Sequence, residues 1–322
     1  MSARSEAATM TQRVGARQWR QALWITLAAV ALYVGFRNLP TGSNLNHIDF
    51  RTGGSPGSLE MCDPANPQFI PVIAVRSPVS MTLISENGPA TAGREVKGVV
   101  RLATASGKPI GPVDLLVMHT RKLHLLVTDP SLRDYQHLHP EPGEKPGEWV
   151  FHFTPRYAGL YRVFGDFTPV ATGRGLYSGA DLEVAPADSV ANTSGSLASE
   201  AISAERIRTQ QDGYDFTLTV SDAPLRAGRT GDLAFSIARA DGGAVALRPV
   251  MDAYAHLVAF DEARSGFAHL HPNEIDLSQP LDSREPRLTF KITIPKPGRY
   301  VVWAQVKLGD EESFVPFPVE VL

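Results

Sequence analysis

Histidine has the most marked pattern of any residue type in this chain. Seven of the nine histidines lie in or just before two segments, HLLVTDPSLRDYQHLHP from His124 to Pro140 and HLVAFDEARSGFAHLHP from His256 to Pro272. Aligned without a gap, the two segments share seven of their seventeen positions. Unrelated segments would share about one, so this identity indicates an internal repeat built around imidazole side chains.

The spacing within each segment predicts three imidazoles on one patch. His137 and His139 point to the same side of a strand, because side chains alternate between its two faces. His124 lies 13 residues before His137, and a hairpin turn at residues 129–134 would place it across from His139. Cross-strand neighbours on one face have Cβ atoms about 5 Å apart, close enough for their rings to share one metal ion. The same spacing recurs in the second segment, at His256, His269 and His271.

A fourth candidate ligand lies five residues before the first histidine of each segment, at His119 and at Met251. Calcium and magnesium prefer oxygen ligands, and zinc has little use for a thioether. Copper accepts both imidazole and thioether, so the pattern favours copper first, zinc second, and nickel or iron after them. Because no cysteine lies near either cluster, a blue-copper electron-transfer site is excluded.

The alternative interpretation is that the histidines are structural, and that they bond backbone carbonyl groups or lie solvated at a sheet edge. We interpret Asp129 and Asp261 as turn formers that bond their own backbone, with an outer-sphere contact to a ligand ring as the alternative. His152 has no counterpart in the second predicted domain, and we expect it to be structural or peripheral. The predicted metal ligands are His119, His124, His137, His139, Met251, His256, His269 and His271.

Composition limits the class of protein. The chain has 322 residues with 43% hydrophobic and 20% charged residues, which is typical of globular domains. The net charge is −3, so no basic surface predicts nucleic-acid binding. Cys62 is the single cysteine, so neither an intrachain disulfide nor a cysteine-ligated cluster can form.

The amino-terminal segment predicts a membrane anchor. Residues 1–21 contain four arginines, and Ala22–Phe36 is apolar and uncharged. By the positive-inside rule, residues 1–21 are a cytoplasmic basic segment and 22–39 a single-pass transmembrane anchor in the inner membrane. The domains that follow would then lie in the periplasm or outside the cell. A cleaved signal peptide is the alternative.

The rest of the chain reads as short strands between turns. We expect a tether at 40–70, a first β-sandwich domain at 71–185, a linker at 186–204 and a second β-sandwich domain at 205–322. Predicted strands include Val113–His119 and Leu123–Thr128, and each half continues into a proline-glycine turn followed by a tyrosine, at Tyr161 and Tyr300. The predicted fold class is all-β, with two tandem immunoglobulin-like or cupredoxin-like sandwiches after the transmembrane helix.

The pattern HLV…(Y/F)xHxHP followed by P-x-G-x-Y resembles a group of poorly characterised bacterial envelope proteins with immunoglobulin-like domains. It is also distantly similar to the YtkA/FixH-type periplasmic domains, which are implicated in copper handling and oxidase assembly. The resemblance covers both predicted domains. It implies an envelope location and metal handling, and it implies no reaction.

Three functions follow as hypotheses. The first is a membrane-anchored, extracytoplasmic protein that sequesters copper or delivers it to an envelope partner, without catalysis. The second is a structural or adhesive module in which the histidines are scaffold. The third is an enzyme whose three-histidine site activates water on zinc or oxygen on copper, but no carboxylate partner at a diagnostic spacing and no nucleophile motif supports it.

Overall fold

The computed structural model describes residues 15–37, 45–50, 68–187, 200–203 and 205–322. The first unit of the chain contains helix α1 (Ala16–Arg37). This helix begins before the predicted anchor at 22–39 and ends two residues before the end of that anchor. Its 20-residue window Arg17–Phe36, with a mean hydropathy of 1.2, is long and apolar enough to cross a membrane or to serve as a signal sequence. At about 1.5 Å per residue, such a helix matches a hydrocarbon core about 30 Å thick.

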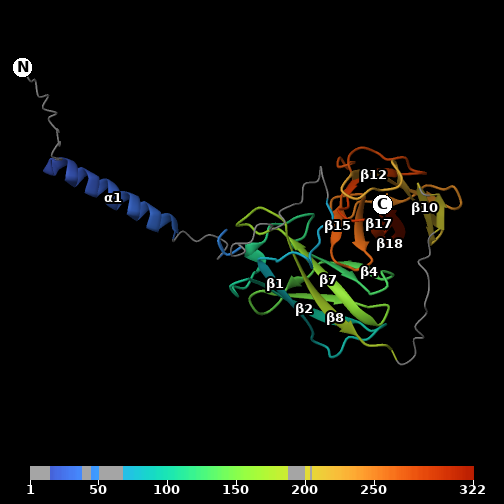
Figure 1. Cartoon of the computed structure of the whole chain (residues 1–322), viewed down its shortest axis with the longest axis horizontal. Coiled ribbons are helices and arrows are strands. Elements are labelled where there is room, and N and C mark those ends of the chain that lie inside the picture. The colour runs from blue at the N-terminus through green and yellow to red at the C-terminus, as the bar shows by residue number, and fades with distance from the viewer. Residues whose placement is uncertain (1–14, 38–44, 51–67, 188–199, 204) are drawn as a thin grey trace, which may run out of the picture. The chain divides into compact units, whose positions relative to one another are not determined.

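Residues Ser43–Leu322 form the second compact unit, which contains two β-sandwiches (Figure 1). In the first sandwich, one sheet has the order β1 (Val79–Ser85), β2 (Val96–Thr104), β6 (Glu148–Phe153), β5 (Glu141–Pro142). The other sheet has the order β4 (Tyr135–Leu138), β3 (Leu123–Thr128), β7 (Gly159–Phe167), β8 (Leu176–Val184).

The second sandwich repeats this arrangement. One sheet has the order β16 (Arg287–Thr293), β12 (Thr230–Arg239), β11 (Tyr214–Val220), β10 (Arg206–Gln211), β9 (Glu200–Ser203). The other has the order β13 (Leu247–Arg248), β17 (Gly298–Leu308), β14 (Ala255–Asp261), β15 (Phe267–Leu270), with β18 (Glu311–Val321) paired to β17. The predicted all-β fold with two tandem sandwiches is therefore confirmed.

The segment before the first histidine hairpin differs from the prediction. Val113–His119 is not a strand: η1 (Pro112–Asp114) is a short 3-10 helix, and a tight turn follows at residues 118–121. The Asp114 carboxylate accepts a hydrogen bond from the Gly111 backbone, which stabilises this helical turn. The apolar side chains of Val113 and Val117 are exposed, so their hydrophobicity was a misleading strand signal.

Both histidine hairpins are buried on both faces of their sheets. All six residues of β3 are buried. Leu123, Leu125 and Val127 pack in the core of the first sandwich. Leu126, on the opposite face, belongs to a separate cluster with Phe164, Val258, Phe260 and Trp303, which come from both sandwiches. The sheets that carry the histidines thus pack against each other through a third apolar core.

The predicted tether is partly built into the two domains. Leu45 and Phe50 are buried in the core of the first sandwich. Phe69 is buried in the core of the second, where its ring meets Tyr300 edge-on. Ile70 exchanges backbone hydrogen bonds with Phe267 at the edge of β15. Residues preceding the first domain therefore help to hold the second, while Cys62 lies outside the described residues.

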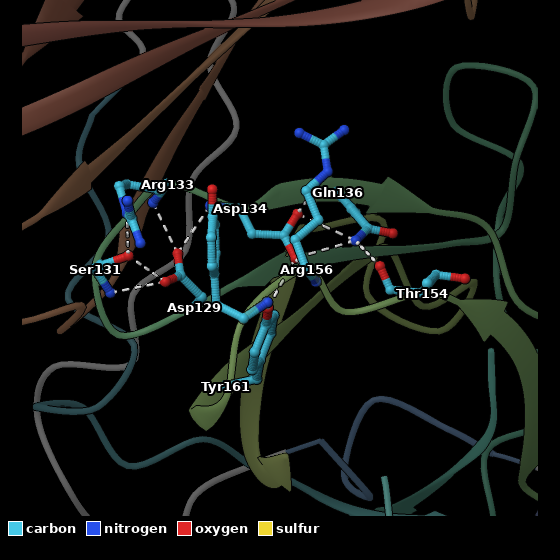
Figure 2. Close-up of polar contacts among 9 residues, drawn as sticks. Asp129, Ser131, Arg133, Asp134, Gln136, Thr154, Arg156 and Tyr161 are labelled. Carbon is cyan, nitrogen blue, oxygen red and sulfur yellow. Dashed lines mark hydrogen bonds and ion pairs between the residues drawn. The ribbon is translucent and has the colours of Figure 1, made fainter. Parts of the chain in front are cut away.

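The turn that closes the first histidine hairpin is stabilised as predicted. The Asp129 carboxylate accepts hydrogen bonds from the backbone of Ser131, Arg133 and Asp134 (Figure 2). Tyr161 is fully buried, and its hydroxyl donates to the Asp134 carboxylate at 2.8 Å. In the second sandwich, Tyr300 donates to the Lys296 carbonyl at 3.0 Å. In the first sandwich, the Tyr161 hydrogen bond thereby ties the hairpin turn to β7.

Candidate metal centre

The first histidine triad forms where β3 meets β4. The two strands pair antiparallel with Leu125 opposite Leu138, and one further step in this register places His124 opposite His139. Ring centroids lie 5.2 Å apart for His124 and His137, 5.1 Å for His124 and His139, and 4.8 Å for His137 and His139. One ligand nitrogen of each ring lies within 4.8 Å of the others, so the predicted patch of three imidazoles is present.

The second triad repeats this geometry between β14 and β15. Leu257 pairs with Leu270, and the same register places His256 opposite His271. Ring centroids lie 5.5 Å apart for His256 and His269, and 4.9 Å apart for both His256 and His271 and His269 and His271. The duplicated sequence therefore builds two sites of the same size.

In the first triad, hydrogen bonds determine which ring nitrogen of His124 and which of His137 carries the proton. His124 Nε2 lies 3.1 Å from the Met118 carbonyl oxygen, which can only accept, so Nε2 donates. His137 Nδ1 lies 2.8 Å from Gln305 Oε1, and the Gln305 amide nitrogen donates to Glu312, which orients the amide. His137 Nδ1 is therefore also a donor.

This assignment leaves two lone pairs facing each other. His124 Nδ1 and His137 Nε2 lie 3.1 Å apart, and neither carries the proton that a hydrogen bond would require. Two nitrogens that each bind a tetrahedral ion at about 2 Å lie about 3.3 Å from one another. The pair is thus placed as two ligands of one cation would be.

The nitrogens of the second triad have the same roles. His256 Nε2 donates to the Val250 carbonyl oxygen at 3.0 Å, and His269 Nδ1 donates to Asp166 Oδ2 at 3.2 Å. The remaining nitrogens, His256 Nδ1 and His269 Nε2, are buried without a hydrogen-bond partner among the described residues, as are His139 Nε2 and His271 Nε2. Buried polar atoms are rarely left unpaired, so these four nitrogens point to a missing ligand.

Burial keeps the rings neutral, which a metal ligand requires. Desolvation lowers the pKa of His124 to about 4 and those of His139, His256 and His269 to about 3. It lowers the pKa values of His137 and His271 well below the ordinary value, and neighbouring histidines add to the effect. Burial also raises the pKa of the Asp166 carboxyl.

The fourth candidates, His119 and Met251, occupy the same tight turn in the two domains. The backbone of Met118 exchanges two hydrogen bonds with that of Arg121, as does that of Val250 with that of Ala253. Both central residues of each turn have positive φ, including 47° at His119 and 50° at Met251. Such turns favour asparagine and glycine. A histidine and a methionine are unusual in this conformation, and both bring a side chain that can bind a metal to the turn.

His119 lies closer to the second triad than to its own. Its ring stacks on His271 with a centroid separation of 3.9 Å, whereas its separation from His124 is 6.5 Å. The structure therefore does not bring it into the first triad, where its place in the sequence had suggested it. Met251 is partly buried in the equivalent turn.

Two polar residues of the centre were missed in the sequence: Asp166 and Gln305. They lie on β7 and β17, opposite His124 and His256 respectively in the strand register. Each interrupts a run of mostly apolar residues in the strand after the proline-glycine turn, VFGDF in β7 and VVWAQV in β17, and this interruption was the available signal. His152, by contrast, lies apart from the triads at the exposed surface, with its Nδ1 3.5 Å from Glu95 Oε1, and His47 is exposed.

A family model described as "Domain of unknown function (DUF8832)" matches residues 77–176 and 209–322. The chain belongs to the DUF8832 family. One matched region covers most of each sandwich, and both triads lie within these regions. No curated protein matches the chain.

Solved structures add only distant likenesses. A DUF4785 family protein from Legionella pneumophila matches with a TM-score of 0.25 and 6% identity over 75% of this chain and 56% of that one. FdeC, an Escherichia coli adhesin, matches with a TM-score of 0.21 and 14% identity over 76% of this chain and 64% of that one. The chain thus spans less than two thirds of either protein, and scores this low carry no functional argument.

Proposed function

We propose that this DUF8832 protein binds transition-metal ions through its two histidine triads. The observation that carries the proposal is the contact between His124 Nδ1 and His137 Nε2, at 3.1 Å, in which both nitrogens present lone pairs. Two lone pairs at this distance repel each other, and a cation between them would turn the repulsion into two coordination bonds. The four buried, unpaired ring nitrogens support the same interpretation.

Copper is the metal we propose first, with zinc as the second choice. Three neutral imidazoles suit either ion. The preference for copper rests on the paired turn positions of His119 and Met251, because a thioether is a ligand for Cu(I) and rarely for zinc. Three protein ligands leave a coordination position open, which suits capture and release of the ion.

We further propose that the role is sequestration or delivery of copper at the cell envelope, rather than catalysis. The apolar helix Arg17–Phe36, preceded by arginines, would hold the chain in the inner membrane with the sandwiches in the periplasm. The resemblance to YtkA/FixH-type domains is in keeping with this location. An envelope protein that accepts the ion is then the expected partner.

The test is the copper content of purified protein after loading and desalting. We expect two ions per chain, one for each triad, and one ion in each of the variants His137→Ala and His269→Ala. His152→Ala is the matched control, because this exposed histidine lies outside both triads, and it should retain both ions. An unchanged copper content in both triad variants would refute the proposal.

A further inference from the structure

The two triads meet at the interface between the sandwiches. The rings of His137 and His269, which belong to different domains, have centroids 5.3 Å apart. This separation matches those within the triads, such as 5.2 Å for His124 and His137 and 5.5 Å for His256 and His269. Ions held by the two triads would therefore be close neighbours.

Each triad depends on the other domain for the partner of its middle histidine. His137 of the first domain donates to Gln305 of the second at 2.8 Å. His269 of the second domain donates to Asp166 of the first at 3.2 Å. The exchange is reciprocal, because Asp166 and Gln305 occupy the same register position in the repeat. These acceptors determine which nitrogen of each ring is free to bind a metal.

The interface that brings these groups together is extensive and specific. It contains the shared apolar core around Phe164 and Trp303. Arg162 of the first domain donates to the Arg264 carbonyl at 2.8 Å, and Arg264 donates back to the Leu160 carbonyl at 2.6 Å. These two hydrogen bonds and the shared apolar core hold the sandwiches together. The reciprocal acceptors, Gln305 and Asp166, are thereby held in place.

We propose that the two triads form a single two-ion centre, assembled by domain docking, in which each domain's acceptor sets the metal affinity of the other domain's triad. This inference rests on the proposed function and extends it. The two halves are not equivalent, because His269 donates to a carboxyl oxygen of Asp166 whereas His137 donates to an amide oxygen of Gln305.

Affinity measurements on single triads test the dependence between domains. His271→Ala leaves the first triad complete and His139→Ala leaves the second, and each variant is titrated with Cu(II) against a competing chelator. In the His271→Ala background, Gln305→Leu should weaken copper binding by about 10- to 100-fold, although Gln305 lies in the other domain. In the His139→Ala background, Asp166→Leu should weaken binding by a similar factor.

A paired exchange separates loss of the acceptor from general damage. Gln305→Glu combined with Glu312→Gln preserves net charge and keeps an acceptor oxygen for His137, because the two side chains already bond at 2.8 Å. This double variant should bind copper at the first triad at least as tightly as the chain with Gln305 does. Wild-type affinity in either leucine variant would overturn the inference while leaving the proposed function standing, since copper would still be bound.

Electron paramagnetic resonance tests the proximity of the two ions. The chain loaded with two Cu(II) ions should show a dipole-coupled pair, and the His139→Ala and His271→Ala variants, with one complete triad each, should show isolated ions. A spectrum of two uncoupled ions in the fully loaded wild-type chain would overturn the two-ion centre. Absence of bound copper in the wild-type chain would instead refute the proposed function.

Discussion

Replacing His139 by alanine should halve the stabilisation that copper gives to the folded protein. His139 is suited to this test because its Nε2 atom has no hydrogen-bond partner among the described residues. Its removal therefore costs the metal-free protein packing but no hydrogen bond at that atom. Its ring lies 4.8 Å from His137 and 5.1 Å from His124, so its loss leaves the first triad with two ligands.

The magnitude follows from linkage. A site filled at 100 times its dissociation constant stabilises the folded state by about 2.7 kcal/mol, so two triads give about 5.4 kcal/mol and one gives half of this. At about 2–4 °C per kcal/mol for a protein of this size, copper should raise the melting temperature by about 11–22 °C in the wild type and about 5–11 °C in His139→Ala.

The assay is a thermal melt of the metal-free and copper-loaded proteins, with free copper at 100 times the measured dissociation constant. His152→Ala is the control, because it removes an exposed histidine that pairs only with Glu95 among the described residues. It should show the full wild-type shift. If His139→Ala shifts as much as the wild type does, His139 is not a ligand and the assignment of the first triad is wrong.

Three further predictions concern pH, the shared core and the turn histidine. Because burial lowers the pKa values of His124, His139, His256 and His269 to about 3–4, the unfolded chain binds more protons than the folded chain below about pH 6.5. In urea melts, the free energy of unfolding of the metal-free protein should therefore fall as the pH drops from 6.5 towards 4, with little change above 7. Constant stability across this range would contradict burial of neutral rings. Phe164→Ala should lower the free energy of unfolding by about 3–5 kcal/mol by leaving a cavity in the shared core, and it should weaken copper binding at both triads. Phe216→Ala, in the separate core of the second sandwich, should lower stability similarly in urea melts but have a smaller effect on copper titrations. Equal effects of the two variants on copper binding would show that binding does not depend on domain docking. Asparagine tolerates the positive φ of this turn, so His119→Asn should preserve the melting temperature while weakening copper binding at the second triad. Unchanged copper affinity would exclude His119 as a ligand.

The composition of each triad was predictable because it depends on contacts between neighbours in the sequence. Strand alternation places His137 and His139 on one face, and the length of the hairpin places His124 beside them. Both rules act over fewer than about 20 residues and depend on backbone geometry alone. The tyrosine that follows each proline-glycine turn was predictable for the same reason.

The turns that carry His119 and Met251 were not predictable from composition. They have positive φ at consecutive residues without the asparagine or glycine that usually marks such a turn. The apolar residues before His119 resembled a strand, yet Val113 and Val117 are exposed and lie outside any strand. Local propensity was misleading here because the backbone of Met118 pairs with that of Arg121 in a tight turn and does not continue as a strand.

One feature of the sequence indicated that the two triads lie side by side, and it was not recognised. Leu123–Thr128 and Ala255–Asp261 lack the polar alternation of a strand with one solvated face, and a strand of this kind is buried on both faces. The second buried face had to pack against something. Only the tertiary structure identifies it as the matching face of the other sandwich.

The sequence by itself therefore determined that the chain carries two β-domains, each with three histidines close enough to share an ion. The tertiary structure decided that the triads adjoin, that Gln305 and Asp166 each serve the opposite domain, and that His119 lies against His271. The physical reason is the range of the interactions. Strand pairing follows from local pattern, whereas the docking of two sheets depends on the summed fit of side chains that are more than 100 positions apart in the chain.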